Sequence, residues 1–365
     1  MVRWNKKKTF RLVWCINHGR KPFSIILYHT TRFCQPNDPV DMPEKAKTSD
    51  TRIRYAKFFG GGFEYEHFLN NAKQLVVMSQ NIKIQEIQCK SAIGKCGFPG
   101  GGWAINPYIG CSHGCVYCYA RFIKRFTGHT EEWGTFVDAR VNIAEVFEKQ
   151  MRSSKYGSER IYIGTVTDPY QPIEGKYKLT RSILKILLNH KNPVSILTKS
   201  DTVLNDLDLL KQFKEIDINF TITTLNEKWK KFVEPNSPTI KQRLQAMEKL
   251  TSKGITVFAM MGPYWPIFTD AEALFRGFKR VGVSHIFTES FNNVGGNWTG
   301  VEKVLRKHYP QFLSEMREIL FNKNKFYEFY NDAEKKIKLL SKKYNIPVTI
   351  YFGLGHAAKF KSVNL

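Results

Sequence analysis

From residue 104 onward, short apolar runs alternate with segments whose apolar residues recur at helical spacing. The apolar and β-branched runs predict strands over 104–109, 161–163, 194–197, 217–224, 255–260 and 283–287. Apolar residues three and four positions apart predict helices over 179–190, 202–213, 240–250 and 270–279. This repeat of strand and helix predicts an α/β protein with a parallel sheet and right-handed crossovers.

The two ends of the chain do not share this repeat. Residues 1–77 mix lysines, scattered aromatic residues and a glycine triplet without sustained periodicity, and predict an uncertain basic N-terminal extension. One hypothesis is that the natural start is Met78 and that the upstream stretch translates non-coding sequence, which the intact mass of the native protein would test. The core then spans 78–300. Residues 301–342 predict one or two helices and 347–351 a late strand, so 301–365 form a helical segment plus a strand.

Three cysteines follow the first predicted strand on one short segment. Cys111, Cys115 and Cys118 have the spacing C-x3-C-x2-C in the run Asn106-Pro-Tyr-Ile-Gly-Cys-Ser-His-Gly-Cys-Val-Tyr-Cys-Tyr-Ala-Arg121. Three thiolates suit three corners of an iron–sulfur cube and leave the fourth iron without a protein ligand. Since an open iron can chelate a small molecule, the spacing indicates chemistry rather than a structural metal.

Zinc is the alternative interpretation of this spacing, with His113 or Cys96 as the fourth ligand. Zinc usually closes its tetrahedron with two separated ligand pairs. The sequence contains no second pair of that kind, so the pattern favours a cluster.

The cysteine run resembles the signature of the radical S-adenosylmethionine (SAM) superfamily, in which an aromatic residue, here Tyr117, precedes the last cysteine. Its longer form is similar to the branch that contains spore photoproduct lyase and the so-called DNA repair photolyases, over roughly residues 88–300. The resemblance implies a partial (β/α)6 TIM-like barrel of the radical SAM type, with a helical C-terminal cap. It also implies a [4Fe–4S] cluster on Cys111, Cys115 and Cys118, which reductively cleaves SAM to a 5′-deoxyadenosyl radical that abstracts hydrogen from a substrate.

The branch pattern also implies cofactor-binding residues at the ends of later strands. Thr167 and Asp168 are candidates for the ammonium group of SAM, although Asp168 equally suits a turn in which it caps the backbone. Lys199 is a candidate for the SAM carboxylate or a substrate phosphate. Thr223 is a candidate for the ribose or the carboxylate, although strand threonine is common.

Other polar and aromatic residues carry weaker expectations. After the fifth strand, Tyr264 or Trp265 is expected to face the site and Met260 to lie in the core. Glu234 and Arg243 are expected to form a structural ion pair.

The branch pattern does not supply the usual hydrogen donor. Spore photoproduct lyase uses a cysteine downstream of the cluster to return hydrogen, whereas no cysteine follows Cys118 here. Tyr170 and Tyr264 are therefore the weak catalytic candidates, and repair of the spore thymine dimer in its usual form is not expected.

Composition and charge bear on the partners. The formal net charge of +24 is spread along the chain, which favours binding of a polyanion such as nucleic acid; a generally basic proteome is the plainer explanation. All seven cysteines lie at or before Cys118, and their odd number argues for reduced thiols. No apolar run has the length of a membrane span and the start lacks a secretory signal, so we expect a cytoplasmic protein without a membrane partner.

The sequence therefore predicts a lyase-like radical SAM enzyme that acts on a nucleic-acid base, with an electron donor such as ferredoxin or flavodoxin. A base buried in duplex would have to be extruded to react. A second hypothesis keeps this chemistry but makes the substrate a peptide or a small metabolite, and salt-dependent binding of nucleic acid separates the two. A third is a non-catalytic zinc and nucleic-acid-binding protein, which would not bind SAM.

Overall fold

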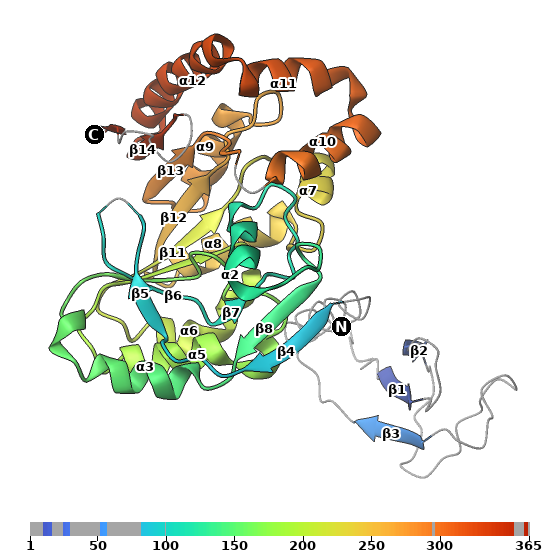
Figure 1. Ribbon diagram of the computed structural model, residues 1–365, viewed down its shortest axis with the longest axis vertical. Coiled ribbons are helices and arrows are strands. Elements are labelled where there is room, and N and C mark those ends of the chain that lie inside the picture. The colour runs from blue at the N-terminus through green and yellow to red at the C-terminus, as the bar shows by residue number, and fades with distance from the viewer. Residues whose placement is uncertain are drawn as a thin grey trace, which may run out of the picture. The chain divides into compact units, whose positions relative to one another are not determined.

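The computed structural model describes residues 10–16, 25–29, 52–56, 82–98, 100–293, 296–353 and 361–363 (Figure 1). Contacts within the chain divide it into two compact units, Met1–Asn70 and Asn71–Leu365. In the first unit, β1 (Phe10–Ile16), β2 (Ile25–His29) and β3 (Arg52–Ala56) pair antiparallel in the order β2-β1-β3. Met78, the hypothetical start, lies outside the described residues.

The second unit is built on a nine-stranded sheet with the order β15-β14-β13-β12-β11-β10-β9-β6-β5. Its central strands pair in parallel and are β6 (Trp103–Ile105), β9 (Ile161–Ile163), β10 (Val194–Thr198), β11 (Ile216–Thr221), β12 (Thr256–Met261), β13 (His285–Glu289) and β14 (Val348–Tyr351). These strands follow one another in space in the order of the sequence. The short strands β5 (Ile93–Lys95) and β15 (Lys361–Val363) pair antiparallel at the two edges. In the part of the chain that is described, no pairing joins β5 to β15. The sheet is therefore an open, partial barrel, as the family resemblance predicted.

Helices cover the outer face of this sheet. They are α3 (Ile143–Met151), α5 (Leu179–Leu187), α6 (Leu207–Leu210), α8 (Ile240–Thr251), α9 (Ala271–Arg280) and α12 (Lys323–Tyr344), with the single turn α4 (Glu174–Tyr177) before α5. Successive helices touch one another around the sheet, from α3 and α5 to α9 and α12 (Figure 1). Strand side chains that point toward this layer are fully buried, among them Ile163, Ile196, Phe220 and Ile286. The apolar core therefore lies between the sheet and the helices.

The inner face of the sheet has a different environment. The alternate strand residues Tyr162, Leu197, Asn219, Phe258 and Phe287 are only half-buried. The parallel register places Asn219 beside Phe258. Since side chains alternate between the two faces of a strand, solvent reaches the inner face. A parallel barrel binds its ligands at the carboxyl ends of its strands, so this open face leads to the expected site.

The first predicted strand, 104–109, is wrong as one element. β6 ends at Ile105, and Tyr108–Ile109 form a separate strand, β7, in a second sheet with the order β4-β8-β7, together with β4 (Lys83–Ile87) and β8 (Phe136–Arg140). Pro107 has no N–H for a ladder, and the side chain of Asn106 bonds Val166 N at 3.0 Å. The chain therefore leaves the main sheet before it reaches the cysteines.

The later elements agree with the predictions more closely. Strands and helices occupy the other predicted positions to within a few residues, although 202–213 is mainly the 3-10 turn η4 (Asp201–Asp206) followed by α6. The prediction of one or two helices over 301–342 is wrong. Three helices are present: α10 (Asn297–His308), α11 (Leu313–Phe321) and α12. Pro310 lies in the break between α10 and α11. The side chain of Asn322 caps the start of α12 by accepting hydrogen bonds from Asn324 N and Lys325 N. Among the described residues, no helix is long and apolar enough to cross a membrane.

Candidate active site at the mouth of the barrel

The three cysteines lie on a loop between β7 and the 3-10 helix η2 (Tyr119–Ile123), which continues into α2 (Lys124–Thr127). Two turns shape it: Gly114 N donates to Cys111 O at 3.2 Å, and Cys118 N donates to Cys115 O at 3.1 Å. Gly110 and Gly114 have positive φ angles of 81° and 62°, which glycine adopts without a steric cost. The glycines therefore allow the loop to turn twice within a few residues.

The cysteine side chains are free thiols in a largely apolar setting, with Cys111 and Cys115 buried and Cys118 half-buried. Burial raises the pKa of the Cys115 thiol to about 12, and it also raises the pKa of Cys118. The pKa of Cys111 is raised by burial and then by the negative charges of Asp168 and the other two thiols. Thiolates here therefore require a cationic partner, which an iron–sulfur cluster would provide.

Two further observations fit a cluster on this loop. In the described part of the chain, no three Cys, His, Asp or Glu side chains converge as a single metal ion requires, whereas a cube distributes its thiolates over different irons. Ser112 Oγ and His113 Nε2 are buried without a hydrogen-bond partner in the structure, so they are available to a bound group. The His113 ring lies against Asp168, with Nδ1 3.3 Å from Oδ2.

The segment after β9 holds one side of the loop. Thr167 Oγ1 donates to Gly110 O at 2.6 Å, and Ser112 N donates to Gln171 Oε1 at 2.8 Å. Gln171 Nε2 in turn donates to Thr167 Oγ1 at 3.1 Å. Thr167 therefore contacts the loop backbone directly, and its role toward SAM stays a prediction.

Asp168 is engaged by several donors of the protein. Its carboxylate accepts from Thr198 Oγ1 at 2.7 Å, from Lys199 N at 2.7 Å and from Tyr170 N at 2.9 Å. Burial would raise the pKa of Asp168, but His113, the backbone N–H of Lys199 and the Thr198 hydroxyl lower it to about 2. The contacts correspond to the backbone-capping interpretation, and a bond from Asp168 to the SAM ammonium stays a prediction.

A buried ion pair holds the other side of the loop. Tyr117 donates its hydroxyl hydrogen to Glu234, which pairs with Arg243 as the sequence predicted. Arg243 also donates to Thr221 O at 2.9 Å and to Ser237 Oγ at 2.6 Å. Burial would raise the pKa of Glu234, but Arg243 and other donors lower it to about 2. The residue before the last cysteine is thus fixed to the end of β11.

Helices α7 (Glu227–Val233) and α10 cover the loop from outside. Val116 N donates to Val233 O at 2.9 Å, and Asn297 Nδ2 donates to Tyr117 O at 2.9 Å. A Cβ atom on Gly300 would lie 2.9 Å from Val116 O, so glycine lets α10 touch the backbone of the loop. Figure 1 shows α7 and α10 side by side at the upper right.

Two predicted cofactor residues follow β10 and β11. Lys199 is half-buried, and its Nζ lies 5.8 Å from the centre of the Tyr117 ring. Burial would lower the pKa of Lys199, but Cys115 and Glu234 raise it overall. Thr223 is buried, and its carbonyl accepts from Thr269 Oγ1 at 2.8 Å. The structure therefore brings Lys199 close to the cysteine loop, whereas Thr223 lies in the turn that follows β11.

The tyrosines proposed as hydrogen donors do not point at the loop. The Tyr170 hydroxyl donates to Asp206 Oδ2 at 2.9 Å, within the outer helical layer. The Tyr264 ring packs against Phe329 and Phe352. Their catalytic roles stay predictions without support from a contact to the cysteines.

The sequence predicted that Trp265 faces the site and that Met260 lies in the core, and the structure shows the reverse. Trp265 is fully buried, with its ring against Tyr117, so it belongs to the core. Met260 is half-buried on the inner face, because it stands in register with Thr221 and Phe287. Alternation along β12 decides the position of Met260, whereas Trp265 lies beyond the end of that strand.

Two residues of the site were missed. Tyr119 follows the last cysteine and donates its hydroxyl hydrogen to Thr165 O. Glu289 ends β13 on the inner face and is half-buried. Burial raises the pKa of Glu289 to about 7, although Lys199 opposes the shift. The sequence predicts that this strand ends at 287, two residues before its end in the structure, so the pattern does not place Glu289 at the strand end where a barrel binds its ligands.

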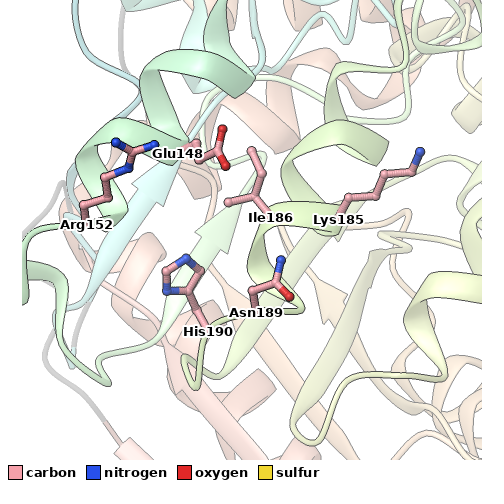
Figure 2. A pocket seen from close by; sticks show the side chains of 6 residues that line it. All are labelled: Glu148, Arg152, Lys185, Ile186, Asn189 and His190. Carbon is pink, nitrogen blue, oxygen red and sulfur yellow. The ribbon is translucent and has the colours of Figure 1, made fainter.

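A hollow of about 290 Å³ lies elsewhere, between α3 and α5 on the outer layer (Figure 2). Its lining residues are Glu148, Arg152, Lys185, Ile186, Asn189 and His190. None of them belongs to the cysteine loop or to the strand ends, so the hollow is not part of the candidate site.

Comparison with known proteins adds three findings. The family profile "Radical SAM superfamily" matches residues 105–274, which include all three loop cysteines. Protein MJ0683 of Methanocaldococcus jannaschii is 34% identical over 265 residues, which are 72% of this chain and 95% of that protein. The "Radical SAM Nalpha-GlyT isomerase" of Pseudomonas phage M6 is 25% identical over 214 residues, 56% of this chain and 43% of that protein.

Among solved structures, a spore photoproduct lyase mutant with bound AdoMet and dinucleoside spore photoproduct has a TM-score of 0.57 to this chain. The match covers 78% of this chain and 85% of that chain at 16% identity. At this identity, the likeness concerns the fold.

The buried Glu234–Arg243 pair leads to a stability prediction. Glu234→Gln leaves the Arg243 charge buried without its partner, so we expect a loss of about 3–5 kcal/mol in the free energy of unfolding. The matched control Glu145→Gln breaks an exposed pair with Lys149 at 2.7 Å, whose attraction water screens, so it should lower the free energy of unfolding far less. Denaturant titration measures both, and equal small losses would contradict the importance of the buried pair.

Glu289 predicts a defined pH dependence. Its pKa is raised in the folded protein from 4.5 to about 7, so between these values the folded state holds a proton that the unfolded state has released. Stability therefore falls as pH rises through this window. The free energy of unfolding of Glu289→Gln minus that of the wild type should increase across the window by roughly 3 kcal/mol. A difference that is constant with pH would show that the carboxyl is not held in a desolvated site.

Proposed function

Because this chain belongs to the radical SAM superfamily and is an enzyme of that superfamily, we propose that it abstracts hydrogen from a nucleic-acid base. Superfamily membership implies a [4Fe–4S] cluster and SAM as cofactors. When bound, the two cofactors supply the radical that removes the hydrogen atom. The protein then has to position the target C–H group and exclude water.

The proposal rests on one observation above all: three cysteines, two of them buried and one half-buried, lie on one hydrogen-bonded loop beside an inner barrel face that is open to solvent. Cys111, Cys115 and Cys118 would hold the cluster, with Tyr117 as the aromatic residue of the motif. Lys199 is placed to neutralise a carboxylate or phosphate near the loop. Thr167, Asp168 and Thr223 complete the proposed cofactor-binding set.

Aromatic side chains on the inner face support a base as the substrate. The Phe258 and Phe287 rings lie 5.8 Å apart, and the His285 ring lies 4.5 Å from Phe287. Stacking of a base on an aromatic side chain contributes about 1–3 kcal/mol. The net charge of +24 favours the approach of a polyanion, and the related fold of spore photoproduct lyase has been solved with a dinucleoside photoproduct.

We also propose that an acidic electron donor of the ferredoxin or flavodoxin kind docks over α7 and α10. The exposed lysines of these helices are Lys228, Lys231, Lys303 and Lys307. The helices contact the cysteine loop through Val233 and Gly300, so a carrier bound there would approach the cluster from outside. The inner face would remain free for SAM and substrate.

The central test is the formation of 5′-deoxyadenosine from SAM by anaerobically purified, reconstituted and reduced protein. We expect product from the wild type and none above background from Cys115→Ala, because that variant loses one of three cluster ligands. The matched control Cys89→Ala should retain activity, since Cys89 lies outside the loop. No product from a fully loaded four-iron preparation, or a protein that binds only zinc, would contradict the enzyme assignment. Single-stranded DNA and RNA should bind with salt-dependent affinity, whereas the alternative of a peptide or small-metabolite substrate predicts no such binding.

The docking surface predicts a reductant-specific defect. The double variant Lys231→Glu, Lys303→Glu should slow cluster reduction by flavodoxin about tenfold at low salt, because charge steering of association is lost. Reduction by dithionite should not change. The control pair Lys211→Glu, Lys214→Glu makes the same charge change beside α6 and should leave both rates unchanged. Equal slowing by the two pairs would show a general charge effect and not a docking site.

A further inference from the structure

We propose that Glu289 is a substrate-recognition residue whose carboxylate accepts a hydrogen bond from an N–H group of a nucleobase at the mouth of the barrel. The inference deepens the proposed function and rests on it. Nothing in the sequence motifs singles out this residue, and its place in the fold carries the argument.

The position of Glu289 follows from the alternation along β13. Ile286 and Thr288 are fully buried toward the helices, whereas His285, Phe287 and Glu289 are half-buried on the inner face. Glu289 is the last residue of its strand and stands in register with Tyr351. Its backbone is fixed, because Glu289 O accepts from Tyr264 N at 2.8 Å. The Glu289 side chain therefore lies at the C-terminal end of a barrel strand, beyond the aromatic residues Phe258 and Phe287 of the inner face.

The neighbouring strand leaves room for this side chain. A Cβ atom on Gly262 would lie 2.7 Å from Glu289 Cγ and 3.3 Å from Glu289 Oε1. Gly262 is not among the residues with positive φ, so backbone conformation does not require glycine there. The requirement is space: any larger residue would force the Glu289 side chain out of its position.

The carboxyl of Glu289 has no partner among the residues that the structure describes. Among the described residues, it takes part in no ion pair, and no side-chain or backbone donor forms a hydrogen bond to it. Lys199 is the cation whose charge reaches it, and Tyr119, Tyr330 and Tyr351 are the titratable groups that feel its charge. The carboxylate therefore keeps acceptor positions that no described residue fills, and an N–H group of a bound ligand can occupy them.

The chemistry of the carboxylate selects the part of the substrate that it contacts. A phosphate oxygen would be repelled by a like charge and offers no donor, whereas an imide or exocyclic amine of a base offers an N–H. The aromatic residues Phe258 and Phe287 lie on the same face. A base stacked there would present its edge toward the rim of the barrel, where Glu289 lies.

The test compares the binding of four single-stranded DNA homo-octanucleotides, one for each base, to wild type, Glu289→Gln and the control Glu315→Gln. Glu315 is an exposed carboxylate of α11, so its variant makes the same change of net charge. Fluorescence titrations are run with SAM-loaded holoprotein at about pH 8, above the pKa of about 7. We expect the wild type and Glu315→Gln to discriminate among the four bases, and Glu289→Gln to lose about tenfold of that discrimination.

The possible outcomes test separately the role of Glu289 and the proposed substrate class. Unchanged base ratios in Glu289→Gln, or a wild type that binds all four equally, would overturn the role of Glu289 while leaving nucleic-acid binding intact. Weaker SAM binding by Glu289→Gln with unchanged base ratios would assign the carboxylate to the cofactor instead. A wild type that binds none of the four would overturn the proposed substrate class itself.

A second variant, Gly262→Ala, tests the position of the carboxylate without removing it. Gly262→Ala leaves the carboxylate in the protein but displaces it, so it should reduce base discrimination as Glu289→Gln does. If Gly262→Ala folds with a wild-type circular dichroism spectrum and keeps full discrimination, the position of the carboxylate is not what recognises the base.

Discussion

The Glu234–Arg243 ion pair is the interaction on which the architecture of the site depends. A buried charge pair is expensive to desolvate, and it is tolerated only where hydrogen bonds satisfy both groups. Here Glu234 accepts from Tyr117, while Arg243 donates to backbone carbonyls at the end of β11 and before α8. The pair therefore joins an irregular loop to a strand and a helix of the barrel. Loops that bind clusters have no ladder of their own, so such external bonds determine their shape.

The one-sided cover of the sheet has a comparable effect on a larger scale. Because α3, α5, α6, α8, α9 and α12 lie on the same face of the sheet, the outer residues of the strands form the core and the inner residues remain partly exposed. The same strands thus supply stability through one set of positions and a ligand surface through the other. Substitutions such as Ile196→Ala and Leu197→Ala, one residue apart, would act on different properties of the enzyme.

The sequence contained enough information for the fold class, the order of strands and the position of the cysteine loop, since these follow from periodicity and from a long motif. It also contained the Glu234–Arg243 pair. Three features were not accessible. The end of β6 at Ile105 depends on the hydrogen bond that Asn106 accepts from Val166 N. The hydrogen bonding of the Asp168 carboxylate depends on donors 30 and 31 residues away. The exposure of Met260 depends on the register of the sheet. Local pattern does not determine contacts of that range.

The bond from Asn297 to the Tyr117 carbonyl spans 180 residues, and this has a consequence for biosynthesis. While the ribosome is still making the second half of the barrel, the cysteine loop lacks Glu234, Arg243 and α10, and its thiols have no fixed arrangement to offer. The loop acquires its final shape only after residue 297 has left the exit tunnel. A cluster held by Cys111, Cys115 and Cys118 would therefore depend on contacts that form only when most of the chain is present.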